Sequence, residues 1–385
     1  MPNPSHEDII GSQGLPLVFD ATRSRAAAAD ASPMNEHSCR MLVWSLAGFQ
    51  KDAVLTSAQT GKSWRLPSDE GSHMAGHDAA PAPLDYISAG LVKACLDEIL
   101  TLSVRRGLDI GLVDLKVDNF YRTEGAAPKK TMTGIPLPFT VTVAFPQADI
   151  CREVLAELAR DAIHIAPTAG LFSEITRGLF SISLNGKQLN IDSLPQCAPL
   201  ADDLRQFASL EGAKDPHQRS LLTRDGDATV STAGHPVHVS GTVTKSNGDG
   251  PDTIRMELCA PVGSAWQIDV DGIGGRAPDP LSLVSSGMGF CFMTKLHMLA
   301  ARYKIRIDAS YVLQETRFGP GGATENTQMA PGFSPVKTQL DIWSPAPEDA
   351  IAELVTLTEP ACYVHMACQR ILKPRLRIAE RSLCA

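Results

Sequence analysis

Two cysteines in the second half of the chain, Cys291 and Cys362, lie in a context that suits redox chemistry. Cys291 falls inside a long apolar segment that opens at Pro280, and Cys362 follows a second helix-forming segment. A thiolate can attack a peroxide oxygen to give a sulfenic acid, and a second thiol can condense with that acid before it is oxidised further. Cys291 lies about three turns into its expected helix, too far for the helix dipole to lower its pKa. We therefore expect a nearby cation.

The same residues leave other chemistry open. His365 is a candidate general base, or a group that tunes a cysteine. With His365 as acid and base, Cys291 could instead be the nucleophile of a hydrolase or lyase acting on an activated carbonyl of a small organic substrate. Cys362, His365 and Cys368 could present metal ligands, but no second close ligand pair accompanies them, so we predict no metal and no cofactor. A further alternative is a non-enzymatic protein that binds an apolar small molecule.

Composition limits the class of protein. A chain of 385 residues predicts about two domains. Hydrophobic content of 43% describes a globular chain, and a net charge of −8 argues against a nucleic-acid partner. No apolar run reaches the roughly 20 residues that span a bilayer, and the first residues do not resemble a signal peptide, so we expect a cytoplasmic protein with no membrane partner. Nine cysteines, an odd number, do not suggest a disulfide framework.

Two strings recur along the chain. GKSWRLPSD and APLDYISAGLVKAC in the first half correspond to GSAWQIDVD and DPLSLVSSGMGFC in the second, and 139–172 corresponds to 337–369. When Pro83 is aligned with Pro280, Gly90 falls opposite Gly287. Similarity kept at one spacing over separate segments predicts two diverged copies of one module.

The copies differ at the thiol positions. Ala94 and Ala166 stand in the first copy where Cys291 and Cys362 stand in the second. Cys95 is one residue out of register, about 100° around the helix, and is expected to be a core residue. The chemistry is therefore predicted to belong to the second copy.

Each copy has the pattern of an α+β module. Alternating strands lead to a Trp, a buried helix follows (281–303 in the second copy), and two strands come next. A second helix is expected near Ser344, which could cap it, and Pro360 interrupts it before Cys362. The predicted organisation is an N-terminal arm (1–35), a first module (36–197), a linker (198–234) and a second module (235–385).

These motifs resemble the osmotically inducible protein C and organic hydroperoxide resistance (OsmC/Ohr) superfamily. The similarity rests on P-L-x-L-x-x-x-G-x-x-x-C in the long helix and C-Y-V-H after the second helix. It implies a peroxidase with Cys291 as the peroxidatic thiol and Cys362 as the resolving thiol, an organic hydroperoxide as substrate and a dithiol as reductant. Members form intertwined homodimers, so this chain would be an intrachain pseudo-dimer of tandem modules with one working site. The two-domain chain could itself form a homodimer.

The sequence departs from the family pattern near the site. Leu281 stands where one branch has Glu, Ser282 where another has it, and Tyr363 where Pro is usual. The family also holds its thiolate with an Arg from an N-terminal loop, for which three candidates exist: Arg219, Arg224 and Arg276. We take Arg276, Ser282 and Tyr363 as candidate substrate-binding residues.

Overall fold

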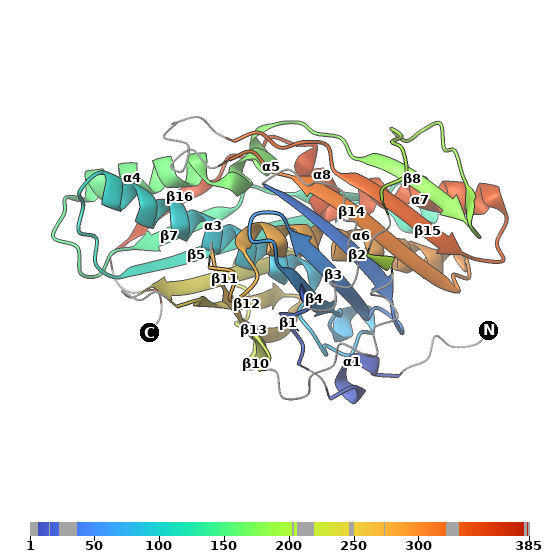
Figure 1. The fold of residues 1–385 in the computed structure, drawn as a ribbon, viewed down its shortest axis with the longest axis horizontal. Coiled ribbons are helices and arrows are strands. Elements are labelled where there is room, and N and C mark those ends of the chain that lie inside the picture. Colours follow the sequence, from blue (N-terminus) through green and yellow to red (C-terminus); the bar gives the residue numbers. More distant parts are fainter. Residues whose placement is uncertain are drawn as a thin grey trace.

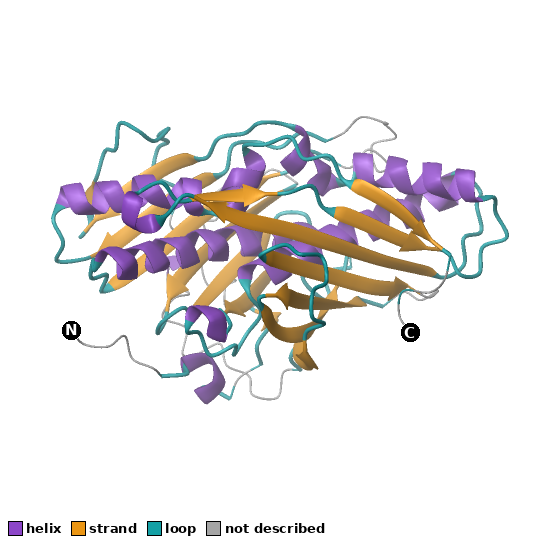
Figure 2. Cartoon of the chain, turned by 180° about the vertical axis from the view of Figure 1, so that it is seen from behind, coloured by secondary structure: helices purple, strands orange, loops and turns teal. Residues whose placement is uncertain are grey.

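The computed structural model describes residues 7–14, 16–22, 37–201, 204–205, 219–245, 250–272, 274–320, 331–380 and 383. Two long helices, α3 (Pro83–Arg105) and α6 (Pro280–Tyr303), lie against each other at the centre of the molecule (Figure 1). Helix α6 packs on one large sheet and α3 on the other. The view from behind shows the strands of both sheets flanking these helices (Figure 2). Within the described ranges, no helix has the length and apolar character needed to cross a membrane.

Both central helices begin with proline at the first turn, where the missing N–H costs nothing. Asp279 caps α6 by accepting a hydrogen bond from the Ser282 N–H at 2.9 Å. The Asp85 carboxylate accepts one from the Ala82 N–H, also at 2.9 Å. Both helices are apolar nearly all round because each is covered by a sheet on one side and by its partner on another. The helix expected over 281–303 is therefore confirmed.

The two helices cross at a reciprocal pair of glycines. A Cβ placed on Gly90 would lie 2.6 Å from the carbonyl oxygen of Pro280, and a Cβ placed on Gly287 would lie 2.6 Å from that of Pro83. Each helix therefore presses its first turn onto the glycine of the other. Only glycine permits this approach without a shift of the backbone.

The first sheet contains eight strands. In spatial order they are β1 (Phe19–Asp20), β4 (Ser63–Ser68), β3 (Lys51–Ser57), β2 (Ser38–Ser45), β14 (Ala309–Arg317), β15 (Lys337–Trp343), β8 (Leu179–Leu184) and β9 (Lys187–Gln188). The second sheet runs β10 (Leu222–Asp227), β13 (Val262–Val270), β12 (Asp252–Ala260), β11 (Val237–Lys245), β5 (Val113–Glu124), β7 (Thr140–Ala144) and β16 (Arg375–Ala379), with β6 (Thr133–Pro136) beside β5. Each sheet thus joins strands from both halves of the chain.

The hydrogen-bond registers of the two sheets correspond. In each sheet one row of directly paired residues starts at a Trp and crosses six strands. The first row is Trp64, Leu55, Met41, Gln314, Thr338 and Phe180. The second row is Trp266, Met256, Gly241, Val117, Val141 and Leu376. Phe180 and Leu376 therefore occupy equivalent positions.

The second helices correspond in the same way. Helix α4 (Arg152–Ile165) ends at the C-cap Ala166 and is followed by the short helices η3 (Pro167–Ala169) and α5 (Gly170–Ser173). Helix α7 (Glu348–Ala361) ends at the C-cap Cys362 and is followed by α8 (Tyr363–Cys368). The remaining short helices are α1 (Ile9–Ser12), η1 (Ser72–Met74) and η2 (Ala127–Lys129).

Several expectations concern segments outside these helices. Ser344 does not cap α7: Pro347 holds the N-cap position, and the Ser344 hydroxyl donates to the Arg306 carbonyl. Strand β1 lies in the range expected as an N-terminal arm, and β10 lies in the expected linker. Residues 1–6, 15 and 23–35 of that arm, and 202–203 and 206–218 of that linker, lie outside the described residues.

Candidate active site

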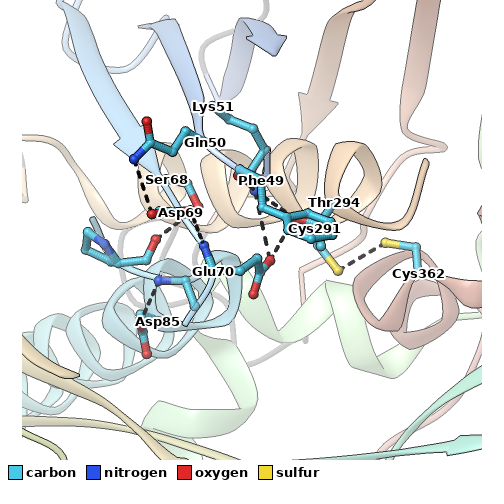
Figure 3. Close-up of polar contacts among 12 residues, drawn as sticks. Phe49, Gln50, Lys51, Ser68, Asp69, Glu70, Asp85, Cys291, Thr294 and Cys362 are labelled. Atoms are coloured by element: carbon cyan, nitrogen blue, oxygen red, sulfur yellow. Dashed lines mark hydrogen bonds and ion pairs between the residues drawn. The ribbon is translucent and has the colours of Figure 1, made fainter. Parts of the chain in front are cut away.

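Cys291 and Cys362 lie side by side in the core. The Cys362 thiol donates to Cys291 Sγ across 3.3 Å, and both residues are buried. Figure 3 shows the two sulfur atoms facing each other, one from α6 and one from the break between α7 and α8. Both thiols are reduced. The spacing of 71 residues in the sequence is thus closed by the packing of α7 and α8 on α6.

The two thiols have opposite pKa shifts. The hydrogen bond from Cys362 lowers the pKa of Cys291, against the opposing effects of burial and of the Glu70 carboxylate; Lys295 and the Val364 amide lower it further. Burial raises the pKa of Cys362 well above its ordinary value, and the neighbouring Cys291 raises it more. Of the two thiols, Cys291 is therefore the one that ionises more readily, and Cys362 is the one that holds its proton more tightly.

Lys295 supplies the positive charge that the thiolate needs. It lies one helical turn after Cys291 on α6, is 6% exposed, and its Nζ lies 4.3 Å from the centre of the Tyr363 ring. Residues four apart on a helix are neighbours on one face. That spacing could have identified Lys295 from the sequence, whereas the family resemblance pointed to arginines in loops.

A buried polar chain from the other half of the molecule reaches the same place. Lys51 Nζ on β3 donates to Thr294 Oγ1 at 2.8 Å, and that hydroxyl donates to Glu70 Oε1 at 2.7 Å. Lys51 Nζ also lies 3.9 Å from Glu70. Burial lowers the pKa of Lys51, while the nearby carboxylates and Cys291 oppose that shift. Glu70 follows β4 in an irregular segment, so no periodicity in the sequence pointed to it.

His365 contacts the second thiol. Its Nδ1 lies 3.3 Å from Cys362 Sγ, and its ring lies 5.0 Å from Phe292 and 6.1 Å from Phe180, centre to centre. Burial lowers the pKa of His365 to about 4, so the ring is neutral at pH 7. Its Nε2 has no hydrogen-bond partner among the described residues. The described residues hold no group of three side chains placed to bind a metal ion.

A cavity of about 120 Å³ opens onto Cys291. It is lined by residues of both halves: Glu70, His73, Met74, Ala82, Pro83, Leu84, Val237, Leu258, Pro261, Cys291, Thr294, Lys295 and Tyr363. Its walls are mostly apolar. Glu70, Thr294 and Lys295 line it together with Cys291, so its polar side chains lie on the side of the Cys291 thiol.

The candidate substrate-binding residues fall in different places. Tyr363 lines the cavity, and its hydroxyl lies 2.8 Å from Thr123 Oγ1. The Ser282 hydroxyl donates to Asp279 at the start of α6, and the Arg276 guanidinium pairs with Asp271 at 3.1 Å. Neither residue is part of the cavity lining.

The two other arginines are also paired with carboxylates. Arg219 pairs with Asp269 at 3.3 Å and Arg224 with Asp78 at 3.2 Å. Neither belongs to the lining of the cavity beside Cys291. Lys295, unlike the three candidate arginines, lines that cavity.

In comparisons with known proteins, a family model matches part of the second half of the chain. Residues 273–376 match the family model described as OsmC-like protein, and that range includes both thiols. Among solved structures, an OsmC-like hydroperoxide resistance protein from Jannaschia sp. CCS1 is 19% identical, with 34% of this chain and 84% of that chain covered and a TM-score of 0.20. A search of curated proteins found no match. Over residues 273–376, this chain is therefore similar to OsmC-like proteins.

Proposed function

We propose that the protein is a thiol-dependent peroxidase that reduces organic hydroperoxides, with Cys291 as the peroxidatic and Cys362 as the resolving cysteine. The observation that carries this proposal is the 3.3 Å contact between two thiols whose pKa values are shifted in opposite directions. A low-pKa thiolate beside a protonated thiol suits attack by the first and resolution by the second. The match of residues 273–376 to the OsmC-like family model supports it.

In the first step the Cys291 thiolate attacks the terminal oxygen of the hydroperoxide. An S–O bond forms, the O–O bond breaks, and Cys291 becomes a sulfenic acid while the peroxide is reduced to an alkoxide. The alkoxide takes a proton and leaves as an alcohol. The Lys295 ammonium, which lines the cavity with Cys291, is positioned to stabilise the thiolate and then the departing oxygen.

In the second step Cys362 attacks the sulfenic sulfur. A disulfide forms, and the sulfenic hydroxyl leaves as water after it receives the proton of Cys362. The neutral His365 beside Cys362 can take this proton as the attack begins and return it to the leaving hydroxyl. An external dithiol then reduces the disulfide and restores both thiols.

The cavity favours a hydroperoxide with an apolar organic group. Met74, Leu84, Val237 and Leu258 form walls that an alkyl or aryl group can contact, while the polar end would point to Cys291. A volume of about 120 Å³ favours a small substrate.

We further propose that the chain consists of two diverged OsmC-like modules, 36–197 and 235–385, joined by 198–234. The equivalent sheet rows and the reciprocal contacts of Gly90 and Gly287 support this organisation. Because the first module has Ala94 and Ala166 at the thiol positions, it would provide Glu70 and Lys51 to a site whose thiols come from the second.

Turnover with cumene hydroperoxide and dihydrolipoamide tests the activity. We expect hydroperoxide consumption that depends on the dithiol and persists in Cys39→Ala, a control that removes a buried thiol elsewhere. Absence of dithiol-dependent consumption by folded protein would overturn the peroxidase proposal. The hydrolase alternative, with His365 as acid and base, predicts that Cys291→Ser abolishes turnover while Cys362→Ser does not. The contact of His365 with Cys362 does not favour this alternative.

A further inference from the structure

A second and larger cavity lies between α3, α4 and α5 of the first half of the chain and the segment 371–376 that leads into β16. Its volume is about 340 Å³, within the range of small-molecule sites. Its lining is Leu91, Cys95, Phe139, Arg160, Ile163, His164, Thr168, Ala169, Phe172, Ser173, Ile371, Leu372, Lys373, Pro374 and Leu376. Cys291, Cys362 and Lys295 are not part of it.

Three positions around this cavity carry small or non-aromatic side chains, whereas the equivalent positions near Cys362 carry rings. Counted from the prolines that open the two central helices, Cys95 on α3 is equivalent to Phe292 on α6. Counted from the C-caps of α4 and α7, Ala169 is equivalent to His365. The equivalent sheet rows end at Leu376 and Phe180.

Phe292, His365 and Phe180 form a packed cluster of rings near Cys362. Their equivalents Cys95, Ala169 and Leu376 all line the cavity. At three equivalent positions the side chain beside the cavity is therefore smaller than its counterpart in the ring cluster. Protein interiors are normally filled to high density, so space retained at three coordinated positions needs a reason.

The two charged side chains that line this cavity, Arg160 and Lys373, are both basic. Arg160 and His164 lie one turn apart on α4, Lys373 precedes β16, and all three are exposed. The lining contains no acidic residue, and no described carboxylate lies within ion-pairing distance of the three. Ile371 at the same cavity is 58% exposed. An apolar interior beside Arg160 and Lys373, which pair with no carboxylate among the described residues, is complementary to an apolar body that ends in an anion.

We propose that this cavity is a binding site for a small organic carboxylate, with the apolar body between α3 and β16 and the carboxylate at Arg160, His164 and Lys373. The site is distinct from the thiol pair and does not depend on the peroxidase activity. The Cys95 thiol contributes packing there, because burial raises its pKa to about 12 and keeps it protonated.

Calorimetric titration of the full chain with octanoate tests the proposal, with octylamine as a probe of equal length and opposite charge. We expect octanoate to bind and octylamine to bind at least about tenfold more weakly. Arg160→Ala combined with Lys373→Ala, both exposed positions, should weaken octanoate by about tenfold. Equal binding of the two probes, or unchanged octanoate affinity in the double variant, would overturn it.

Cys95→Phe restores in α3 the ring that Phe292 provides in α6. The cavity can take this ring, so we expect a folded variant that no longer binds octanoate, whereas Cys291→Ser should bind it unchanged. If Cys95→Phe is folded and still binds, or if Cys291→Ser abolishes binding, the ligand lies elsewhere and the proposal is wrong. Should Cys95→Phe fail to fold, the double variant and the octylamine comparison decide alone.

Discussion

Cys362 directs its proton at Cys291: the two sulfur atoms lie 3.3 Å apart, and this hydrogen bond is the main cause of the lowered Cys291 pKa. In the proposed peroxidase mechanism, this one contact gives attack and resolution to different residues. The thiol that donates to Cys291 would also be the thiol that later attacks the sulfenic sulfur.

Serine substitutions should separate the two roles. We expect Cys291→Ser to abolish hydroperoxide reduction altogether. Cys362→Ser should reduce one equivalent of hydroperoxide and then stop, because the sulfenic acid has no resolving partner. Stopped-flow consumption followed by dimedone labelling of Cys291 measures both. Continuous turnover by Cys362→Ser with dihydrolipoamide would show that Cys362 does not resolve.

Lys295→Gln should raise the pKa of Cys291. Removal of the nearby positive charge destabilises the thiolate, so the pH midpoint for alkylation of Cys291 by iodoacetamide should move up by about one unit. Lys295→Arg keeps the charge and is the matched control, with a midpoint near that of the parent. An unchanged midpoint in Lys295→Gln would mean that another cation holds the thiolate.

Glu70→Gln should act in the opposite direction. The Glu70 carboxylate raises the pKa of Cys291, so its neutralisation should move the alkylation midpoint to lower pH. The amide can still accept from Thr294, which keeps the local geometry. An alkylation midpoint at higher pH would show that the charge of Glu70 does not raise the pKa of Cys291, and that Glu70 acts by holding neighbouring side chains such as Thr294 in place.

The glycine crossing of the central helices should be essential for stability. Gly287→Ala places a Cβ 2.6 Å from the Pro83 carbonyl, and we expect a loss of about 1–3 kcal/mol in the free energy of unfolding by urea. Gly250→Ala, with nothing within 4 Å of its Cβ, is the control. Equal stability of the two variants would contradict the tight crossing.

His365 should make the protein less stable in acid. Its pKa is about 4 in the folded protein and 6.5 ordinarily, so the unfolded chain takes up a proton that the folded chain does not as the pH falls from 6.5. The loss is complete below about pH 4 and is on the order of 3 kcal/mol. Urea unfolding at about pH 6.5 and at about pH 4 should show that the free energy of unfolding falls less in His365→Phe than in the parent. The exposed His77→Gln should behave as the parent, and an identical loss in His365→Phe would refute this assignment.

Much of the site could be predicted from spacing. The motifs singled out Cys291 and Cys362 and predicted the buried helix that carries Cys291, since these depend on local sequence patterns. The prediction that Ser344 caps α7 was wrong, because its hydroxyl donates a hydrogen bond to the Arg306 carbonyl. Local sequence preferences do not encode such a tertiary contact.

Two residues beside Cys291, Lys295 and Glu70, were not predicted from the sequence. Lys295 could have been found by its helical spacing from Cys291. Glu70 could not, because it reaches the site from an irregular segment of the other half of the chain, beside the packing of β3 on α6. The second cavity was also beyond prediction, since it becomes visible only when equivalent positions are compared in space.

Peptide mapping after addition of one equivalent of cumene hydroperoxide to reduced protein tests the central claim most directly. The account predicts a disulfide between Cys291 and Cys362 as the main product, removed again by dihydrolipoamide. Recovery of both residues as free thiols, or a disulfide that joins Cys291 to any other cysteine, would contradict it.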